Sequence, residues 1–146
     1  MLMRVGLINK SRHPNPSYKT PGSSGMDIRA NIKNSIFIKP GEQMAVPTGI
    51  FVEIPESFEI QVRPRSGLAF KNGITVLNAP GTIDSDYRGE ILVILINHSL
   101  KIFEIQDGDR IAQLVVSRVE KIDWQNVEKS TLTERGFGGF GSTGTK

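Results

Sequence analysis

The chain has 146 residues, of which 38% are apolar and 23% charged, with no cysteine and a formal net charge of +3. These values fit one globular domain, and they exclude a disordered chain, a disulfide framework and a thiolate metal site. The basic residues are scattered, which favours a solvated surface or a site for a small anionic ligand over a surface for a nucleic-acid polymer.

Short strand signals recur along the chain, while no apolar 3.6-residue period persists over a dozen residues. The expected strands, in chain order, are Met3–Ile8, Ser35–Ile38, Gln43–Ile54, Phe58–Arg63, Ile74–Leu77, Gly89–Asn97, Lys101–Ile105 and Arg110–Val119. One short helix is expected at Ser66–Asn72, ended by Gly73. Many short strands with Gly and Pro turns are typical of an all-β sandwich, jelly roll or barrel.

The run Ile91–Ile96 is apolar on both faces of its expected strand, so both faces need to be covered. Burial against other subunits is one solution. The same run is the longest apolar stretch and is far too short to cross a bilayer, and the N-terminus lacks the apolar segment of a signal peptide. Because cysteine is also absent, we expect a cytoplasmic protein that does not bind membranes.

The composition changes at Arg135, after which five glycines follow within ten residues. Such density predicts a segment that is mobile when no ligand is bound. We therefore divide the chain into a β domain, residues 1–134, and a tail, residues 135–146. The Arg135 guanidinium and the hydroxyls of Ser142 and Thr143 suit a phosphate, and Phe140 suits a flat base. A flexible low-complexity end is the alternative.

Four further segments combine turn residues with side chains that suit a phosphate or a catalytic water. They are Gly25–Ala30, Pro64–Ala69, Asn78–Ile91 and Gly108–Leu114. One aspartate of the third segment is suited to act as a general base. Taken alone, each segment is equally consistent with an ordinary turn beside a strand. The sequence contains neither HExxH nor a nucleophile elbow, so a metal would be held mainly by substrate oxygens, as Mg²⁺ is with nucleotides.

Together, the five segments resemble in order the five motifs of the trimeric dUTPase family, from about Gly22 to Gly144. The matching stretches are Ser-Gly-Met-Asp-Ile-Arg-Ala, Pro-Arg-Ser-Gly-Leu-Ala, Gly-Thr-Ile-Asp-Ser-Asp-Tyr-Arg-Gly-Glu-Ile, Gly-Asp-Arg-Ile-Ala-Gln-Leu and Arg-Gly-Phe-Gly-Gly-Phe-Gly-Ser-Thr-Gly. The resemblance implies a jelly-roll-like, distorted β-barrel in a homotrimer whose active sites are shared between subunits. It implies Mg²⁺-dependent hydrolysis of dUTP to dUMP and pyrophosphate, which supplies dUMP for thymidylate synthesis and keeps uracil out of DNA.

The resemblance also implies a role for each site residue. Asp84 would activate the attacking water, and Asp27 would help to hold Mg²⁺ through water. Tyr87 would pack under the sugar where a ribose hydroxyl would clash. The uracil would be read by Asn78, Gly81, Thr82 and Ile83, and the phosphates would be bound by Arg65, Ser66, Gly67 and Gln113. The tail would add Arg135, Phe140, Gly141, Ser142 and Thr143.

Two alternatives remain open. A dCTP deaminase shares the fold but carries a catalytic glutamate on the strand after the third motif, where Ile91–Ile96 has no acid, and it lacks a glycine-rich tail. A non-catalytic nucleotide-binding regulator would need neither Asp84 nor the complete tail. Release of pyrophosphate from dUTP separates both alternatives from a dUTPase.

Overall fold

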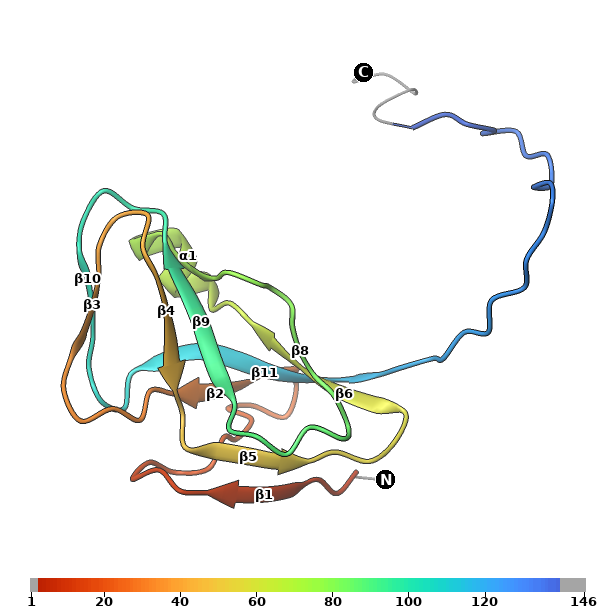
Figure 1. Ribbon diagram of the computed structural model, residues 1–146. Helices are drawn as coiled ribbons and strands as arrows, with labels where there is room; N and C mark the ends of the chain where they lie inside the picture. Colours follow the sequence, from red (N-terminus) through yellow and green to blue (C-terminus); the bar gives the residue numbers. More distant parts are fainter. Residues whose placement is uncertain (1–2, 140–146) are drawn as a thin grey trace.

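The computed structural model describes residues 3–139, which form eleven short strands and one short helix (Figure 1). The strands are β1 (Gly6–Asn9), β2 (Met26–Arg29), β3 (Ile36–Ile38), β4 (Gln43–Pro47), β5 (Ile50–Glu53), β6 (Phe58–Arg63), β7 (Ile74–Val76), β8 (Gly81–Ile83), β9 (Leu92–Asn97), β10 (Phe103–Ile105) and β11 (Arg110–Arg118). The helix α1 (Ser66–Asn72) ends at Gly73, whose φ of 64° is left-handed. The expected all-β class and the expected helix with its glycine stop are confirmed.

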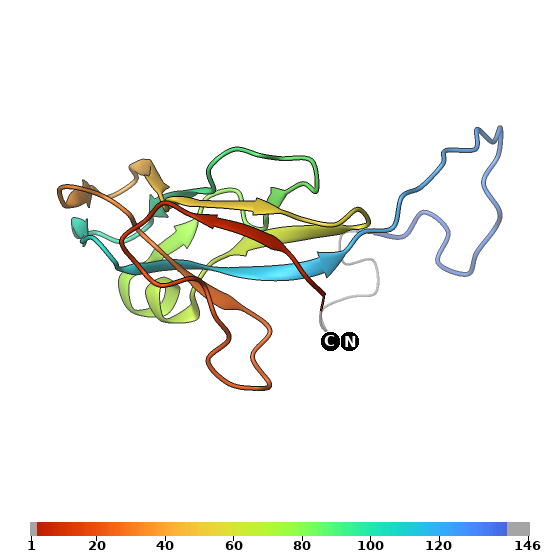
Figure 2. The same cartoon turned by 90° about the horizontal axis from the view of Figure 1, so that it is seen from below.

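The strands pair antiparallel in four small sheets, with the orders β1-β5, β10-β3, β2-β11-β6-β8 and β4-β9-β7. The sheets lie in layers, as the second view shows (Figure 2). Within the described residues they stay separate rather than closing into one continuous barrel.

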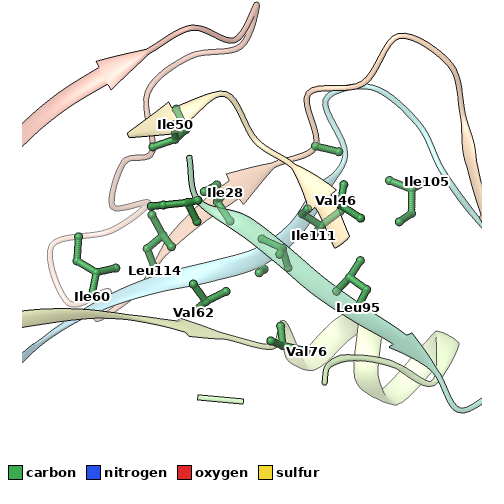
Figure 3. Close-up of a cluster of buried hydrophobic side chains, with 14 of the residues drawn as sticks. Ile28, Val46, Ile50, Ile60, Val62, Val76, Leu95, Ile105, Ile111 and Leu114 are labelled. Atoms are coloured by element: carbon green, nitrogen blue, oxygen red, sulfur yellow. The ribbon is translucent and has the colours of Figure 1, made fainter. Parts of the chain in front are cut away.

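One apolar core receives side chains from all four sheets (Figure 3). Ile28, Val46, Ile50 and Ile105 each represent a different sheet, and none of them is more than 3% exposed. Full burial of one such side chain stabilises the fold by about 1.5–3 kcal/mol. The core therefore fixes the sheets relative to one another, and with them the loops that leave their ends.

The apolar stretch that we expected to form one strand, Gln43–Ile54, is divided between β4 and β5. Gly49 adopts a φ of +69°, and a Cβ there would lie 2.8 Å from the backbone nitrogen of Ser11. The Gly49 N–H donates to Glu90 Oε1 at 2.7 Å, which holds the bend. The expectation was wrong at this point because a left-handed glycine inside an apolar run breaks the strand and redirects the chain to another sheet.

The sequence also did not predict β8, which lies in the segment that we read as a turn. Gly81 pairs with Val62 and Ile83 pairs with Ile60, so this short strand extends the sheet at the edge of β6. A Cβ on Gly81 would lie 3.3 Å from the Val62 side chain, so the close approach favours glycine.

Strand β9 is covered on only one face within a single chain. Val93 and Leu95 are fully buried, whereas Leu92 is 47% exposed and Ile94 and Ile96 are only partly buried. The second face of this apolar strand therefore still lacks cover in the isolated chain.

The chain leaves the β body after Val119, whose N–H donates to the Ser57 carbonyl at 2.8 Å. The segment from Glu120 to Gly139, which we call the arm, runs away from the body in both views (Figures 1 and 2). It exposes large apolar side chains, among them Trp124 at 84% and Leu132 at 101%. No helix in the described part of the chain is long and apolar enough to cross a membrane.

Candidate active site

A carboxylate held by two guanidinium groups forms the centre of the candidate site. Asp27 on β2 accepts from Arg65 Nε through Oδ1 at 2.9 Å and from Arg110 Nη1 through Oδ2 at 3.1 Å. Arg65 Nη1 also donates to the Arg110 carbonyl at 3.1 Å. The side chains of Asp27 and Arg65 are only 20% and 26% exposed, so these pairs are partly shielded from water. Two cations around one anion leave a net positive charge, which suits a polyphosphate.

Gln113 lies on the central strand of three, β2, β11 and β6, behind this cluster. On β11 it pairs with Asp27 on one side and with Arg63 on the other. Its Nε2 donates to the Pro64 carbonyl at 2.9 Å, and a Cβ on Gly25 would overlap its Oε1. The side chain therefore holds the backbone immediately before Arg65, and its contribution to phosphate binding stays a prediction.

Ser66 and Gly67 begin helix α1 next to Arg65. The first N–H groups of a helix have no acceptor within that helix, so they are available to an anion. No atom lies within 4 Å of where a Gly67 Cβ would stand. A pocket of about 230 Å³ borders this turn, and its lining residues are Arg65, Leu68, Phe103, Asp109, Arg110 and Ile111.

The residues expected to read uracil lie on and just before β8. The amide Nδ2 of Asn78 lies 3.2 Å from where a Gly81 Cβ would stand, so the side chain packs directly on the strand. Thr82 is exposed, and Ile83 is partly buried. These residues form one short stretch of backbone and side-chain polar groups, and their contact with a base stays a prediction.

Tyr87 closes the turn that follows β8. Its hydroxyl donates to the Glu90 carbonyl at 3.0 Å, and its ring lies so close to Gly89 that a Cβ there would overlap it. Tyr87 is 43% exposed, and the hydrogen bond from its hydroxyl holds the direction of the ring. A fixed and accessible ring is consistent with the expected packing under a sugar.

Asp84 is exposed at the end of β8. It borders a pocket of about 440 Å³, whose charged lining residues are Glu56, Glu59, Asp84, Asp86 and Lys121. The carboxylate of Asp84 therefore borders open space that a water can occupy. Asp86, two positions further along the chain, lines the same pocket.

The register of β8 places Asp84 and Arg65 at opposite ends of β6. Asp84 follows Ile83, which pairs with Ile60 near the start of β6, whereas Arg65 lies beyond Arg63, where β6 ends. A strand rises about 3.3 Å per residue, so the stretch between Ile60 and Arg63 alone spans roughly 10 Å. One chain therefore brings together the first, second and fourth motifs, but it keeps Asp84 apart from them.

The described part of the tail stands apart from both groups. Arg135 Nε donates to the Gly138 carbonyl at 2.8 Å within the arm itself. The remaining tail positions that we expected to bind the substrate, Phe140, Gly141, Ser142 and Thr143, lie outside the described residues.

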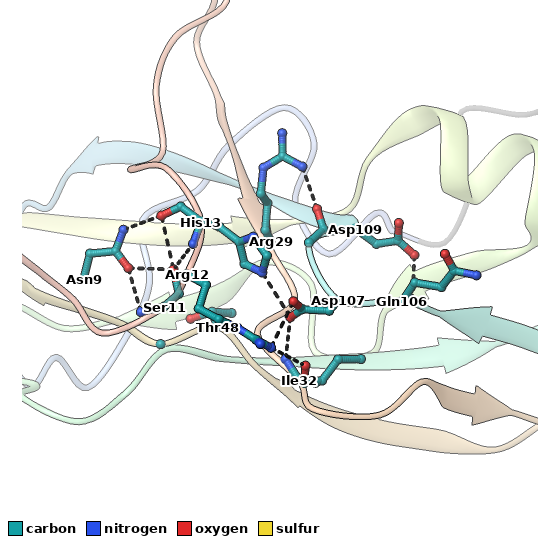
Figure 4. Close-up of polar contacts among 12 residues, drawn as sticks. Asn9, Ser11, Arg12, His13, Arg29, Ile32, Thr48, Gln106, Asp107 and Asp109 are labelled. Atoms are coloured by element: carbon teal, nitrogen blue, oxygen red, sulfur yellow. Dashed lines mark hydrogen bonds and ion pairs between the residues drawn. The ribbon is translucent and has the colours of Figure 1, made fainter.

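The sequence analysis did not single out a polar cluster that supports the turn before Arg110 (Figure 4). Asp107 accepts from His13 Nε2 at 3.0 Å, from Arg12 Nη2 at 3.1 Å and from the Ile32 N–H at 3.0 Å. The hydrogen bonds from His13 and Ile32 lower the pKa of Asp107 below its usual 3.8. His13 and Asp107 are 94 positions apart, so no local pattern in the sequence indicates this contact.

The described residues do not form a metal site by themselves. Within residues 3–139, no group of three or more His, Cys, Asp or Glu side chains is placed to hold a metal ion. Asp27, the residue expected to help hold Mg²⁺, has each of its carboxylate oxygens engaged by a guanidinium. Each of these oxygens still has a second lone pair, so the expected contact of Asp27 with Mg²⁺ through water stays a prediction.

Comparison with known proteins agrees with the order of the motifs. The family model of dUTPase matches residues 11–144. The deoxyuridine 5'-triphosphate nucleotidohydrolase of Finegoldia magna is 53% identical over 142 residues, which cover 97% of this chain and 99% of that protein. The Fusobacterium nucleatum enzyme of the same name is 54% identical, with 97% of each chain covered.

Solved structures show the same fold at lower identity. The dUTPase of Staphylococcus bacteriophage 80alpha with dUpNHpp has a TM-score of 0.87 and 24% identity, over 97% of this chain and 98% of that one. A mutant dUTPase from phage phi11 of S. aureus, described with a structural Mg(II) ion, has a TM-score of 0.79 and 20% identity, over 88% and 99%. From the family match and the high identity to its relatives, we conclude that this chain belongs to the dUTPase family.

Proposed function

We propose that this protein hydrolyses dUTP to dUMP and pyrophosphate. The observation that carries the proposal is the convergence of the first and fourth motifs on Pro64 and Arg65 of the second, in a chain that belongs to the dUTPase family. Hydrolysis of a triphosphate depends mainly on positioning and charge neutralisation, and a cluster with two arginines supplies both. The product dUMP serves thymidylate synthesis, and removal of dUTP keeps uracil out of DNA.

The expected residue roles fit this reaction. Arg65, with the N–H groups of Ser66 and Gly67 beside it, would bind phosphate oxygens. Asp84 would orient and deprotonate the water that attacks the α-phosphorus. The bond from that phosphorus to the bridging oxygen of the pyrophosphate would then break. Tyr87 would exclude a ribose hydroxyl, and the segment from Asn78 to Ile83 would hold uracil.

We further propose that the working unit is a homotrimer with shared active sites. Two observations support it: β6 separates Asp84 from Arg65 in one chain, and β9 leaves an apolar face uncovered. A neighbouring subunit could supply Asp84 to the Arg65 cluster and cover Leu92 in the same contact. The arm and tail of a third subunit would then close over the nucleotide.

Mg²⁺ enters this proposal as part of the substrate. The phosphate oxygens of dUTP are the expected ligands of the ion, and Asp27 would contact it through water. We place the reaction in the cytoplasm, where nucleotide pools lie, and the absence of cysteine is consistent with that compartment.

A turnover assay across dUTP, dCTP, dTTP and UTP tests the proposed function. The expected result is release of pyrophosphate from dUTP, with much lower kcat/KM for the other three nucleotides. Ammonia released from dCTP would instead identify a deaminase. Binding of dUTP without release of any product would identify a regulator.

A further inference from the structure

Asp27 is placed to orient arginines. Each of its two oxygens meets a different guanidinium, at 2.9 Å for Arg65 and 3.1 Å for Arg110. A free arginine side chain samples many rotamers and loses that freedom when it binds an anion. A partly buried acceptor that fixes the guanidinium beforehand removes part of this cost before the ligand arrives.

We propose that Asp27 is a positioning residue for polyphosphate binding, which orients Arg65 even where no metal ion is bound. This inference rests on the proposed function for the identity of the anion. A guanidinium carries five N–H donors, and Arg65 uses Nε toward Asp27 and one Nη1 donor toward the Arg110 carbonyl. Three donors, one on Nη1 and both on Nη2, have no hydrogen-bond acceptor within residues 3–139, and they are available to a phosphate.

The backbone supports the same orientation from the other side. Asp27 pairs in register with Gln113, and the Gln113 amide donates to the carbonyl of Pro64, the residue before Arg65. Strand β2, strand β11, the Pro64 backbone and the Arg65 side chain thus form a closed ring of contacts. Both ends of Arg65, its Cα and its guanidinium, are fixed by this ring.

The charge of Asp27 gives the proposal a test with a definite sign. Replacement by asparagine removes one negative charge beside the phosphate site, and by Coulomb's law alone this change strengthens the binding of an anion. Loss of orientation has the opposite effect, because asparagine accepts more weakly and cannot pair with two cations. We expect Asp27→Asn to weaken the binding of inorganic pyrophosphate about tenfold, measured by calorimetry on the full-length protein in EDTA.

Asp109→Asn is the matched control. Asp109 borders the same pocket, and its carboxylate accepts from the Gln106 N–H at 2.8 Å rather than from an arginine. The control removes the same charge without removing a guanidinium partner, so pyrophosphate should bind equally well or more tightly. Thermal melting of both variants checks that each is folded. If Asp27→Asn does not fold, Asp27→Glu keeps the charge but displaces both oxygens, and it must itself weaken pyrophosphate binding.

A double-mutant cycle separates positioning from a general structural effect. In an Arg65→Lys background, the further change Asp27→Asn should cost much less than tenfold, because only Arg110 is left for Asp27 to orient. The proposal would be overturned if Asp27→Asn bound pyrophosphate equally well or more tightly than the unmodified protein. It would also be overturned if the tenfold loss were unchanged in the Arg65→Lys background, or if the unmodified protein did not bind pyrophosphate. Absence of dUTP turnover with normal pyrophosphate binding would instead refute the proposed function, and the cycle would still decide the role of Asp27.

Discussion

Asp84 and Arg65 lie at opposite ends of strand β6, because β8 runs antiparallel to β6 and carries Asp84 toward the start of that strand. The separation is set by backbone pairing, so side-chain movement alone does not remove it. If both residues act on one dUTP molecule, the proposed trimer lets a different subunit supply each of them.

Mixed trimers test this sharing of sites. Asp84→Asn and a deletion of residues 135–146 are each expected to be nearly inactive alone. After the two variants are unfolded and refolded together in equal amounts, a site is complete when the deleted chain supplies Asp84 and the other variant supplies the tail. Random assortment in a closed three-fold ring makes about a quarter of the sites competent. Mixing that is confirmed by mass but restores no activity would contradict the shared site.

Asp84→Asn should lower kcat by about 10²–10⁴-fold while leaving dUTP affinity nearly unchanged, because the general base is lost and the phosphate contacts remain. The matched control is Asp86→Asn, which changes a carboxylate that lines the same pocket. Single-turnover kinetics and a binding titration separate the two effects. Comparable losses in both variants would show that the pocket needs its total charge rather than a base at Asp84.

Tyr87→Ala should narrow the ratio of kcat/KM for dUTP over UTP, because the ring would no longer occupy the space that a 2′-hydroxyl needs. Tyr87→Phe keeps the ring and loses only the hydrogen bond to the Glu90 carbonyl. The phenylalanine variant should therefore keep most of the discrimination. A ratio that is the same in all three proteins would place the selection of the sugar elsewhere.

Leu92→Asp should dissociate the trimer, because a carboxylate on the uncovered face of β9 would be desolvated in a subunit contact. The control Leu100→Asp changes a leucine that is 95% exposed in the turn after β9. Size-exclusion chromatography with light scattering measures both masses. A Leu92→Asp variant that remains trimeric would show that this face lies outside the subunit contact.

Asp107 should make stability depend on pH in the acid range. Its pKa in the folded protein lies below the ordinary 3.8, so its contribution is complete above that value and is lost as the pH falls through the lower folded pKa. Asp107→Asn should therefore lower the melting temperature most at neutral pH, and the difference from the unmodified protein should shrink below about pH 3.8. A difference that stays constant from pH 7 to pH 3 would show that the charge of Asp107 contributes nothing.

Local sequence signals predicted much of the fold. Strand β6 and helix α1 have the expected bounds, since alternation and a stop glycine act within a few residues. The division of Gln43–Ile54 was missed because Gly49 has its left-handed conformation only in the packed structure, where Ser11 leaves no room for a side chain. The short strand β8 was missed because its partner strand, rather than its composition, defines it.

The sequence by itself determined the family and the residue types of the site, because its five motifs are contiguous segments that can be read without a structure. Only the tertiary structure decided which of these residues meet. Asp27 is 38 positions from Arg65 and 83 from Arg110, and the pairing of β2 with β11 brings them together. A different pairing, that of β8 with β6, separates Asp84 from Arg65. Strand register depends on the packing of the whole core, and no local pattern in the sequence records it.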